Sequence, residues 1–160
     1  MINKTPVAAL LLTAVLATMH AHGAALLEPG DAFPDFSAQD QHGADYRFET
    51  GTKTVLVAFD MATSKLANRI LAAETPEFLD DHHAVYISDI HGMPSIGRYF
   101  AFPKMRKYPH RIIVADAEHL LDPFPREEGR VTVIRLDDNA VVESIRFWNP
   151  EDDSIRDVLP

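Results

Sequence analysis

The sequence contains no cysteine among its 160 residues, and this absence excludes a whole class of chemistry. The thiolate is the nucleophile in thiol-disulfide exchange and in thiol-dependent peroxide reduction, so this chain can carry out neither reaction. It also has no disulfide to form. Packing and hydrogen bonds must therefore hold the folded state together without a covalent cross-link.

Hydrophobic runs long enough to span a membrane are also missing. The main apolar stretch, Val7–Ala17, is interrupted only by Thr13 and is about half of the roughly 20 residues that cross a bilayer. Lys4 precedes it, and small residues that suit signal cleavage follow it at Ala21, Gly23, Ala24 and Ala25. This order predicts an export signal over residues 1–25 and a mature domain over residues 26–160, with a retained N-terminal anchor as the alternative.

Basic residues are scarce relative to acidic ones. The chain has 15 Lys and Arg against 24 Asp and Glu, a formal net charge of −9. Nucleic acids and anionic membranes are bound by clustered Lys and Arg, so we expect neither as a partner and no membrane insertion after signal cleavage. Within this acidic chain, four basic residues fall close together at Lys104, Arg106, Lys107 and Arg111. The predicted location is periplasmic or secreted.

Strand patterns recur along the mature chain. Residues 54–59 are almost wholly apolar, which is typical of a central strand covered on both faces. Further strands are predicted over residues 84–90 and 110–115, and a hairpin over residues 131–136 and 141–147 has turn-forming residues at its tip.

Helices are predicted between these strands. The first follows the strand at residues 54–59 and is capped by Thr63 or Ser64. A short helix restarts at Pro76, another opens at Pro94 or Ser95 with an interruption at Pro103, and the last starts at Asn149. The alternation predicts an α/β fold, a mixed sheet with helices on both faces.

Two segments carry a resemblance to a known family. The lead-in contains Gly30, Asp31, Pro34, Asp35 and Phe36 and resembles the opening of the redoxin branch of the thioredoxin superfamily, which includes peroxiredoxins and exported TlpA-like thiol reductases. The run Val131–Asp137 is similar to that family's cis-proline, threonine, apolar stretch and final aspartate. The resemblance implies a thioredoxin-like fold over nearly all of residues 26–160. A second resemblance, to a group of exported proteobacterial proteins, rests on other residues: Asp60-Met61, Lys65-Leu66, Ala84-Val85, Asp89-Ile90, Met93-Pro94, Phe100-Ala101, Pro103, Met105-Arg106, Tyr108 and Arg111.

The chain departs from that family at its reactive positions. Aligned on the C-x-x-C motif of the thiol reductases, the two cysteine positions hold Ser64 and Ala67; aligned on the peroxiredoxin T-x-x-C motif, Thr63 matches and Leu66 replaces the cysteine. Val131 stands at the cis-proline position. A serine hydroxyl stays protonated without a dedicated base and does not replace a thiolate. The resemblance therefore implies a member without thiol chemistry.

Two clusters are candidate binding sites. The first is the loop after the strand at residues 54–59, at the edge where α/β sheets place ligands; its residues are Asp60, Met61, Thr63, Ser64 and Lys65, with Val131 and Thr132 as neighbours. The alternative is an inherited loop with a helix cap and a surface ion pair. The second is the basic cluster with interleaved aromatics, represented by Arg106, Tyr108 and Arg111 and joined by Tyr99, Phe100 and Phe102. It fits an anionic partner, or it is a solvated helix end whose aromatics belong to the core.

These observations predict a non-catalytic module that binds a periplasmic protein or a small ligand. We expect no catalytic residue, no cofactor and no metal site, because the histidines show no zinc-ligand spacing and no G-x-G-x-x-G loop is present. An oxidoreductase that uses a bound flavin or metal in place of a thiol is the alternative. A third hypothesis is that the protein is a structural subunit of an envelope complex.

Overall fold

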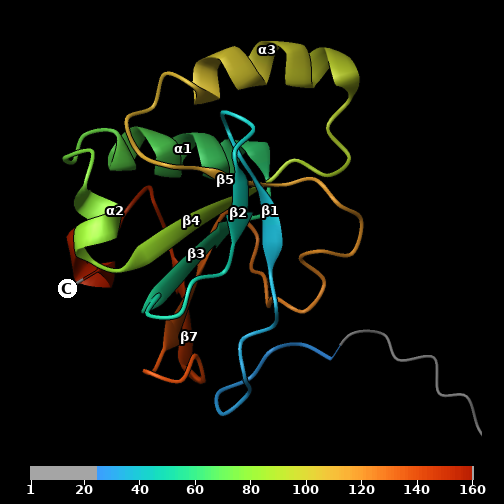
Figure 1. Cartoon of the computed structure of the whole chain (residues 1–160). Helices are drawn as coiled ribbons and strands as arrows, with labels where there is room; N and C mark the ends of the chain where they lie inside the picture. The colour runs from blue at the N-terminus through green and yellow to red at the C-terminus, as the bar shows by residue number, and fades with distance from the viewer. Residues whose placement is uncertain (1–24, 160) are drawn as a thin grey trace, which may run out of the picture.

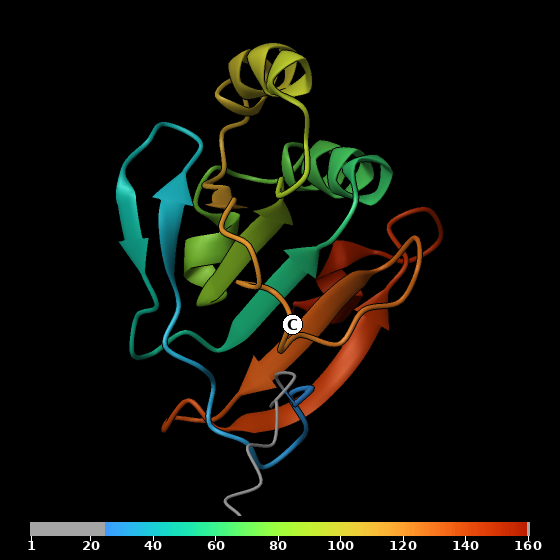
Figure 2. The same cartoon turned by 90° about the vertical axis from the view of Figure 1, so that its right-hand side faces the viewer.

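A seven-stranded mixed sheet forms the centre of the protein, in the order β2-β1-β5-β4-β3-β6-β7 (Figures 1 and 2). The computed structural model describes residues 25–159, so most of the predicted export signal lies outside the described residues. The strands are β1 Ser37–Asp40, β2 Asp45–Arg47, β3 Thr54–Ala58, β4 Ala84–Asp89, β5 Ile113–Ala115, β6 Val131–Leu136 and β7 Val142–Trp148. The helices are α1 Met61–Leu71, α2 Phe78–Asp81, α3 Ser95–Met105 and α4 Ile155–Val158.

The predicted central strand is confirmed. All five residues of β3 are buried, and the strand pairs in parallel with β4 and antiparallel with β6. The predicted hairpin is β6 and β7, which pair antiparallel with a register shift between Arg135 and Leu136. The mixed α/β fold expected from the alternation of strands and helices is thus the observed one.

The two faces of the sheet are covered differently. One core cluster holds buried side chains from all four helices together with the sheet, and the second holds Leu27, Phe33, Leu121 and Phe124 from irregular segments. Among residues 25–159 the second face is therefore covered by the lead-in and the turns after β5, and not by helices as the prediction of helices on both faces requires. The steps from β3 to β4 and from β4 to β5 run the same way across the sheet, so right-handed crossovers place α1 and α3 on one side.

Two predicted helix boundaries are wrong. α3 continues through Pro103 to Met105, because the proline removes only its own N–H bond and the N–H of Arg106 still donates to the carbonyl of Phe102 at 3.0 Å. The last helix does not start at Asn149. The Asn149 carbonyl accepts from the N–H of Asp153 at 2.9 Å within a turn, and α4 begins at Ile155.

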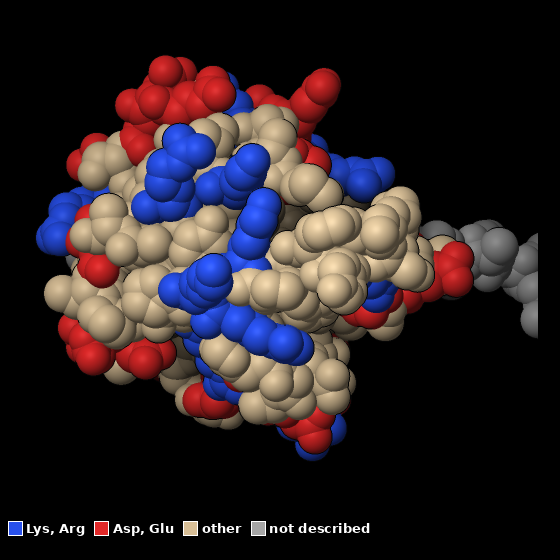
Figure 3. All heavy atoms as spheres, turned by 90° about the horizontal axis from the view of Figure 1, so that it is seen from above, with Lys and Arg blue, Asp and Glu red and all other residues tan. Residues whose placement is uncertain are grey.

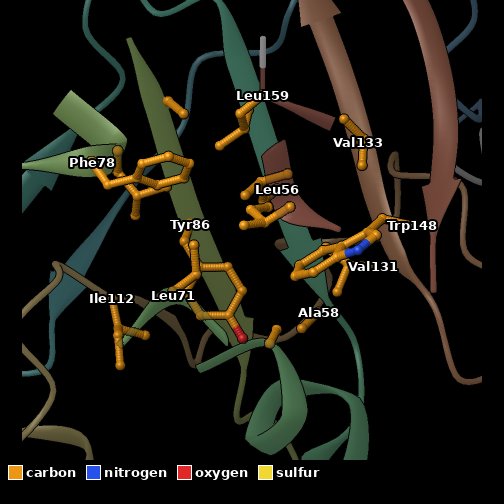
Figure 4. Packing of buried hydrophobic residues seen from close by; sticks show 14 of the residues in the cluster. Leu56, Ala58, Leu71, Phe78, Tyr86, Ile112, Val131, Val133, Trp148 and Leu159 are labelled. Carbon is orange, nitrogen blue, oxygen red and sulfur yellow. The ribbon is translucent and has the colours of Figure 1, made fainter. Parts of the chain in front are cut away.

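Trp148 closes the first core cluster. Its side chain is 1% exposed and shares the cluster with Ile155 and Leu159 at the C-terminus, and its indole N–H donates to the carbonyl of Asp153 at 3.0 Å. Figure 4 shows the indole beside Val131 and Leu56. Trp148 thus packs the C-terminal segment against the sheet. Among the described residues, no helix has the length and apolarity needed to cross a bilayer.

Candidate functional site

The candidate site begins where β3 passes into α1. Phe59 and Asp60 are the whole connection between the two elements. The carboxylate of Asp60 accepts hydrogen bonds from the backbone N–H of Thr63 at 2.9 Å and from its hydroxyl at 2.7 Å. Asp60 is therefore the N-cap of α1. The prediction that Thr63 or Ser64 caps this helix is wrong, because both already lie inside its first turn.

Ser64 is the centre of a buried polar network. Its hydroxyl oxygen lies 2.7 Å from the hydroxyl of Ser88 and 3.0 Å from that of Tyr86, and it accepts from the side-chain amide of Asn68 at 3.3 Å. The residue is only 8% exposed. Figure 4 shows the hydroxyl of Tyr86 directed toward α1. The Ser64 hydroxyl is thus held by neutral hydrogen-bonding groups, and none of these partners is a base that would activate it.

The network ends at His110. The side-chain oxygen of Asn68 lies 2.9 Å from Nε2 of His110, and because the Asn68 amide group faces Ser64, this oxygen accepts the imidazole N–H. His110 is 2% exposed, and its burial lowers its pKa to about 4. Burial likewise raises the pKa of Tyr86. The neutral imidazole therefore reaches Ser64 only through Asn68, an arrangement suited to positioning and not to proton abstraction.

A groove of about 290 Å³ opens beside this network, between α1 and α3. Its wall is mainly apolar and includes Met61, Ser64 and Lys65 from α1, Phe100 and Lys104 from α3, and Tyr108. Asp89 also lines it, and burial raises the pKa of its carboxyl group even though this group accepts the N–H of His91 at 2.8 Å.

The structure brings only part of the predicted set together. Met61, Ser64, Lys65 and Tyr108 line the groove. Thr63, at 2% exposure, turns its hydroxyl to Asp60, while Val131 and Thr132 are fully buried. The hydroxyl of Thr132 donates to the carbonyl of Pro125 at 2.6 Å. These three side chains are not accessible to a ligand.

The two predicted arginines lie elsewhere. Nε of Arg106 donates to the carbonyl of Gln41 at 3.0 Å. Nε of Arg111 donates to the carboxylate of Asp40 at 3.3 Å, and its guanidinium lies 5.2 Å from the ring centroid of Tyr46. Although burial acts in the opposite direction, the N–H groups of Ala44 and His42 and the charge of Arg111 lower the pKa of Asp40. Both arginines thus hold the β1–β2 turn and do not face the groove.

Sequence reasoning missed several groove residues. Asn68, Ser88 and Met93 line the groove but carry no pattern that separates them from ordinary helix or strand positions. Tyr99 and Phe100 are 73% and 60% exposed, so the alternative that the aromatics near the basic cluster belong to the core is wrong for these two. The only signal in the sequence that these side chains share one face of α3 was their spacing of three and four residues from Ile96. Among residues 25–159 no three His, Asp or Glu side chains approach closely enough to hold a metal ion.

Three solved structures illustrate what this structure is similar to. The thioredoxin domain of a thiol-disulfide oxidoreductase from Bacteroides vulgatus is 12% identical, with a TM-score of 0.54 over 84% of this chain and 99% of that one. A protein described as the thiol:disulfide interchange protein DsbE from Chlorobium tepidum is 14% identical, with a TM-score of 0.56 over 82% and 94%. A peroxiredoxin-like protein from Aquifex aeolicus is 10% identical, with a TM-score of 0.52 over 86% of each chain.

These similarities show a thioredoxin-like fold. The descriptions of the first two structures name thiol-disulfide chemistry, whereas this chain has no cysteine. No protein-family model matches the sequence, and no curated protein gives a significant sequence match.

Proposed function

We propose that this protein is a non-catalytic binding module of the bacterial envelope, which recognises its partner at the groove between α1 and α3. The observation that carries the proposal is that the Ser64 hydroxyl is buried and hydrogen-bonded. The thioredoxin-like fold is present, yet the side chain in the first turn of α1 is a buried hydroxyl with three hydrogen-bond partners. Beside it lies a concave, mainly apolar groove that has no thiol.

The envelope location rests on the sequence of residues 1–25, whose basic start, apolar run and small residues match an export signal. The similarity to a group of exported proteobacterial proteins points the same way. Cleavage near residues 21–25 would leave every strand and helix of the described domain, from β1 at Ser37 onward, in the mature chain.

Site-specific photo-crosslinking in intact cells tests the proposal. A photoreactive phenylalanine derivative replaces Met61, which is 59% exposed at the groove, and, as the matched control, Glu143, which is exposed on the edge strand β7. Discrete covalent adducts are expected from position 61 and none from position 143. Identical adducts at both positions, or no adduct at position 61, would contradict the assignment of the groove.

The purified protein provides the second test. Insulin disulfides and hydrogen peroxide should be consumed no faster than in buffer, because the chain has no thiol. An absorbance band from a co-purified flavin, or a stoichiometric metal in elemental analysis, would instead support the oxidoreductase alternative and overturn the non-catalytic proposal.

A further inference from the structure

The helix α3 turns large apolar side chains toward solvent. Ile96, Tyr99 and Phe100 are 67%, 73% and 60% exposed, and their spacing of three and four residues places them on one side of the helix. Only Met105 of α3 is buried. A surface helix normally packs such a stripe against the core, and a contiguous exposed apolar patch is typical of an interaction surface.

This apolar face is continuous with the groove. Phe100 lines the groove from α3 and Met61 lines it from α1, and both side chains are exposed. The groove volume of about 290 Å³ is at the lower limit of the roughly 300–1,000 Å³ of small-molecule sites. Its size therefore suits an apolar side chain inserted from a polypeptide better than a flavin-sized molecule.

Positively charged side chains border this apolar face, and among the residues that line the groove they outnumber the one acidic residue, Asp89. Lys65 and Lys104 line the groove, and Arg69 and Lys107 are exposed nearby in sequence. Figure 3 shows Lys and Arg side chains gathered in a band on the side of the molecule that carries α3. Within residues 25–159 these four cations form no ion pair. A local positive field on a chain of net charge −9 attracts an acidic partner and repels a basic one.

We propose that the groove and the outward face of α3 bind an acidic polypeptide segment that inserts a large apolar side chain between α1 and α3. This inference rests on the proposed function and names the class of partner. The apolar anchor enters the groove beside Met61 and Phe100, neighbouring apolar residues lie on Ile96 and Tyr99, and the acidic side chains of the segment face Lys65 and Lys104. The concave groove and the overall acidity of the protein favour this occupant over a lipid surface.

Three synthetic amphipathic peptides of equal length test the inference by fluorescence anisotropy with the full domain. The first has an acidic polar face and Leu and Phe anchors, the second has the same anchors with a basic polar face, and the third is the acidic peptide with its anchors changed to Ala. The first should bind about tenfold or more tightly than either other peptide, and its affinity should fall as salt is added.

Variants of the domain separate charge from apolar contact. Lys65→Glu/Lys104→Glu should lower the affinity for the acidic peptide by about tenfold or more and raise the affinity for the basic one. Phe100→Ser should lower the affinity for the acidic peptide without changing the salt dependence of that affinity. The matched control is Arg47→Glu/Arg146→Glu, which changes the net charge equally at exposed positions on the edge strands β2 and β7. The affinity of this control variant for the acidic peptide should stay within about twofold of the wild-type affinity. Circular dichroism verifies that each variant is folded.

Several outcomes would overturn the inference. Equal affinity for the acidic and basic peptides, no binding of the acidic peptide, or equal loss in the control variant would each exclude an acidic segment as the partner. Sedimentation of the protein with phosphatidylglycerol vesicles, without peptide binding, would identify a membrane surface instead. If position 61 still gives discrete protein adducts in cells, the proposed function stands and only the class of partner is wrong.

Discussion

At the scale of single residues, Ser64 and His110 show how the interior near the groove is stabilised. Burying a hydroxyl without a partner costs roughly 1–3 kcal/mol, and Ser64 avoids this cost through its contacts with Tyr86, Ser88 and Asn68. His110 completes the chain of contacts with one nitrogen, while its Nδ1 is buried without a partner. A buried imidazole in this setting is stable only in its neutral form.

The neutral state of His110 predicts a pH dependence of stability. Its pKa is about 4 in the folded protein, lowered by burial from 6.5. The unfolded chain binds a proton at this residue below pH 6.5 and the folded chain does not, so the free energy of unfolding falls as the pH decreases from about 6.5 to 4. The full effect is about 3 kcal/mol. Urea denaturation at a series of pH values measures it.

The variant His110→Gln isolates this contribution, because Gln keeps a side-chain donor for Asn68 and does not titrate. The unfolding free energy of the wild type minus that of the variant should decrease steadily from pH 7 toward pH 4. Carboxyl groups such as Asp40 titrate in both proteins and cancel in the difference. A difference that stays constant across this range would show that the pKa of His110 is the same in the folded and unfolded chains.

At the scale of elements, the start of α1 depends on one carboxylate. Asp60 satisfies the N–H and the hydroxyl of Thr63. Asp60→Ala should therefore lower the free energy of unfolding by about 1 kcal/mol, the usual cost of losing an N-cap, while Asp60→Asn, which retains a capping oxygen, should recover most of it. Chemical denaturation of the three proteins measures both. Equal losses for Ala and Asn would show that the charge of Asp60 matters and its cap does not.

The two helices that form the groove differ in how far they could be predicted. For α1 the segment contains Asp60, Thr63 and Ser64, all good capping residues, and only the end of β3 at Ala58 decides that the first of them is the cap. For α3 the positions of Ile96, Tyr99 and Phe100 define one face, but the same spacing is typical of a core-facing stripe. In the folded protein this face of α3 points away from the sheet and stays exposed. The local sequence does not determine this orientation.

At the scale of the whole molecule, the N-terminal lead-in is part of the core. Leu27 and Phe33 are 7% and 8% exposed in the cluster that covers the second face of the sheet, and the ring centroid of Phe33 lies 4.5 Å from that of Phe48. The N–H of Gly30 donates to the carbonyl of Val142 at 2.8 Å. The lead-in thus covers a face of the sheet on which no helix packs among the described residues.

Removing the lead-in should therefore destabilise the entire domain. A chain that begins at Asp35 should unfold at a much lower denaturant concentration than one that begins at Ala25, because each lost core side chain costs roughly 2–5 kcal/mol. If the shorter chain fails to fold, Leu27→Ala in the longer chain should still lower the unfolding free energy by about 2–3 kcal/mol. Leu26→Ala, which changes a side chain that is 57% exposed, is the matched control. Equal midpoints for the two chain lengths would contradict the role of the lead-in.

The local patterns of the chain were sufficient to predict the mixed α/β sheet, the buried strand β3, the β6–β7 hairpin and the absence of thiol chemistry. Each depends on residue type or on a short-range period, and each is a property of the sequence itself. The resemblance of the lead-in and of residues 131–137 to redoxins added the thioredoxin-like fold.

The tertiary structure alone decided which candidate residues share a surface. Thr132 and Arg111 resemble site residues by their place in the sequence, yet one is enclosed by the sheet and the other is held by Asp40. Residues far apart in the chain, such as Met61 and Tyr108, meet at one groove. Such convergence depends on the handedness of the crossovers and on which helix faces the sheet leaves uncovered, and both are set by long-range packing that no single segment specifies.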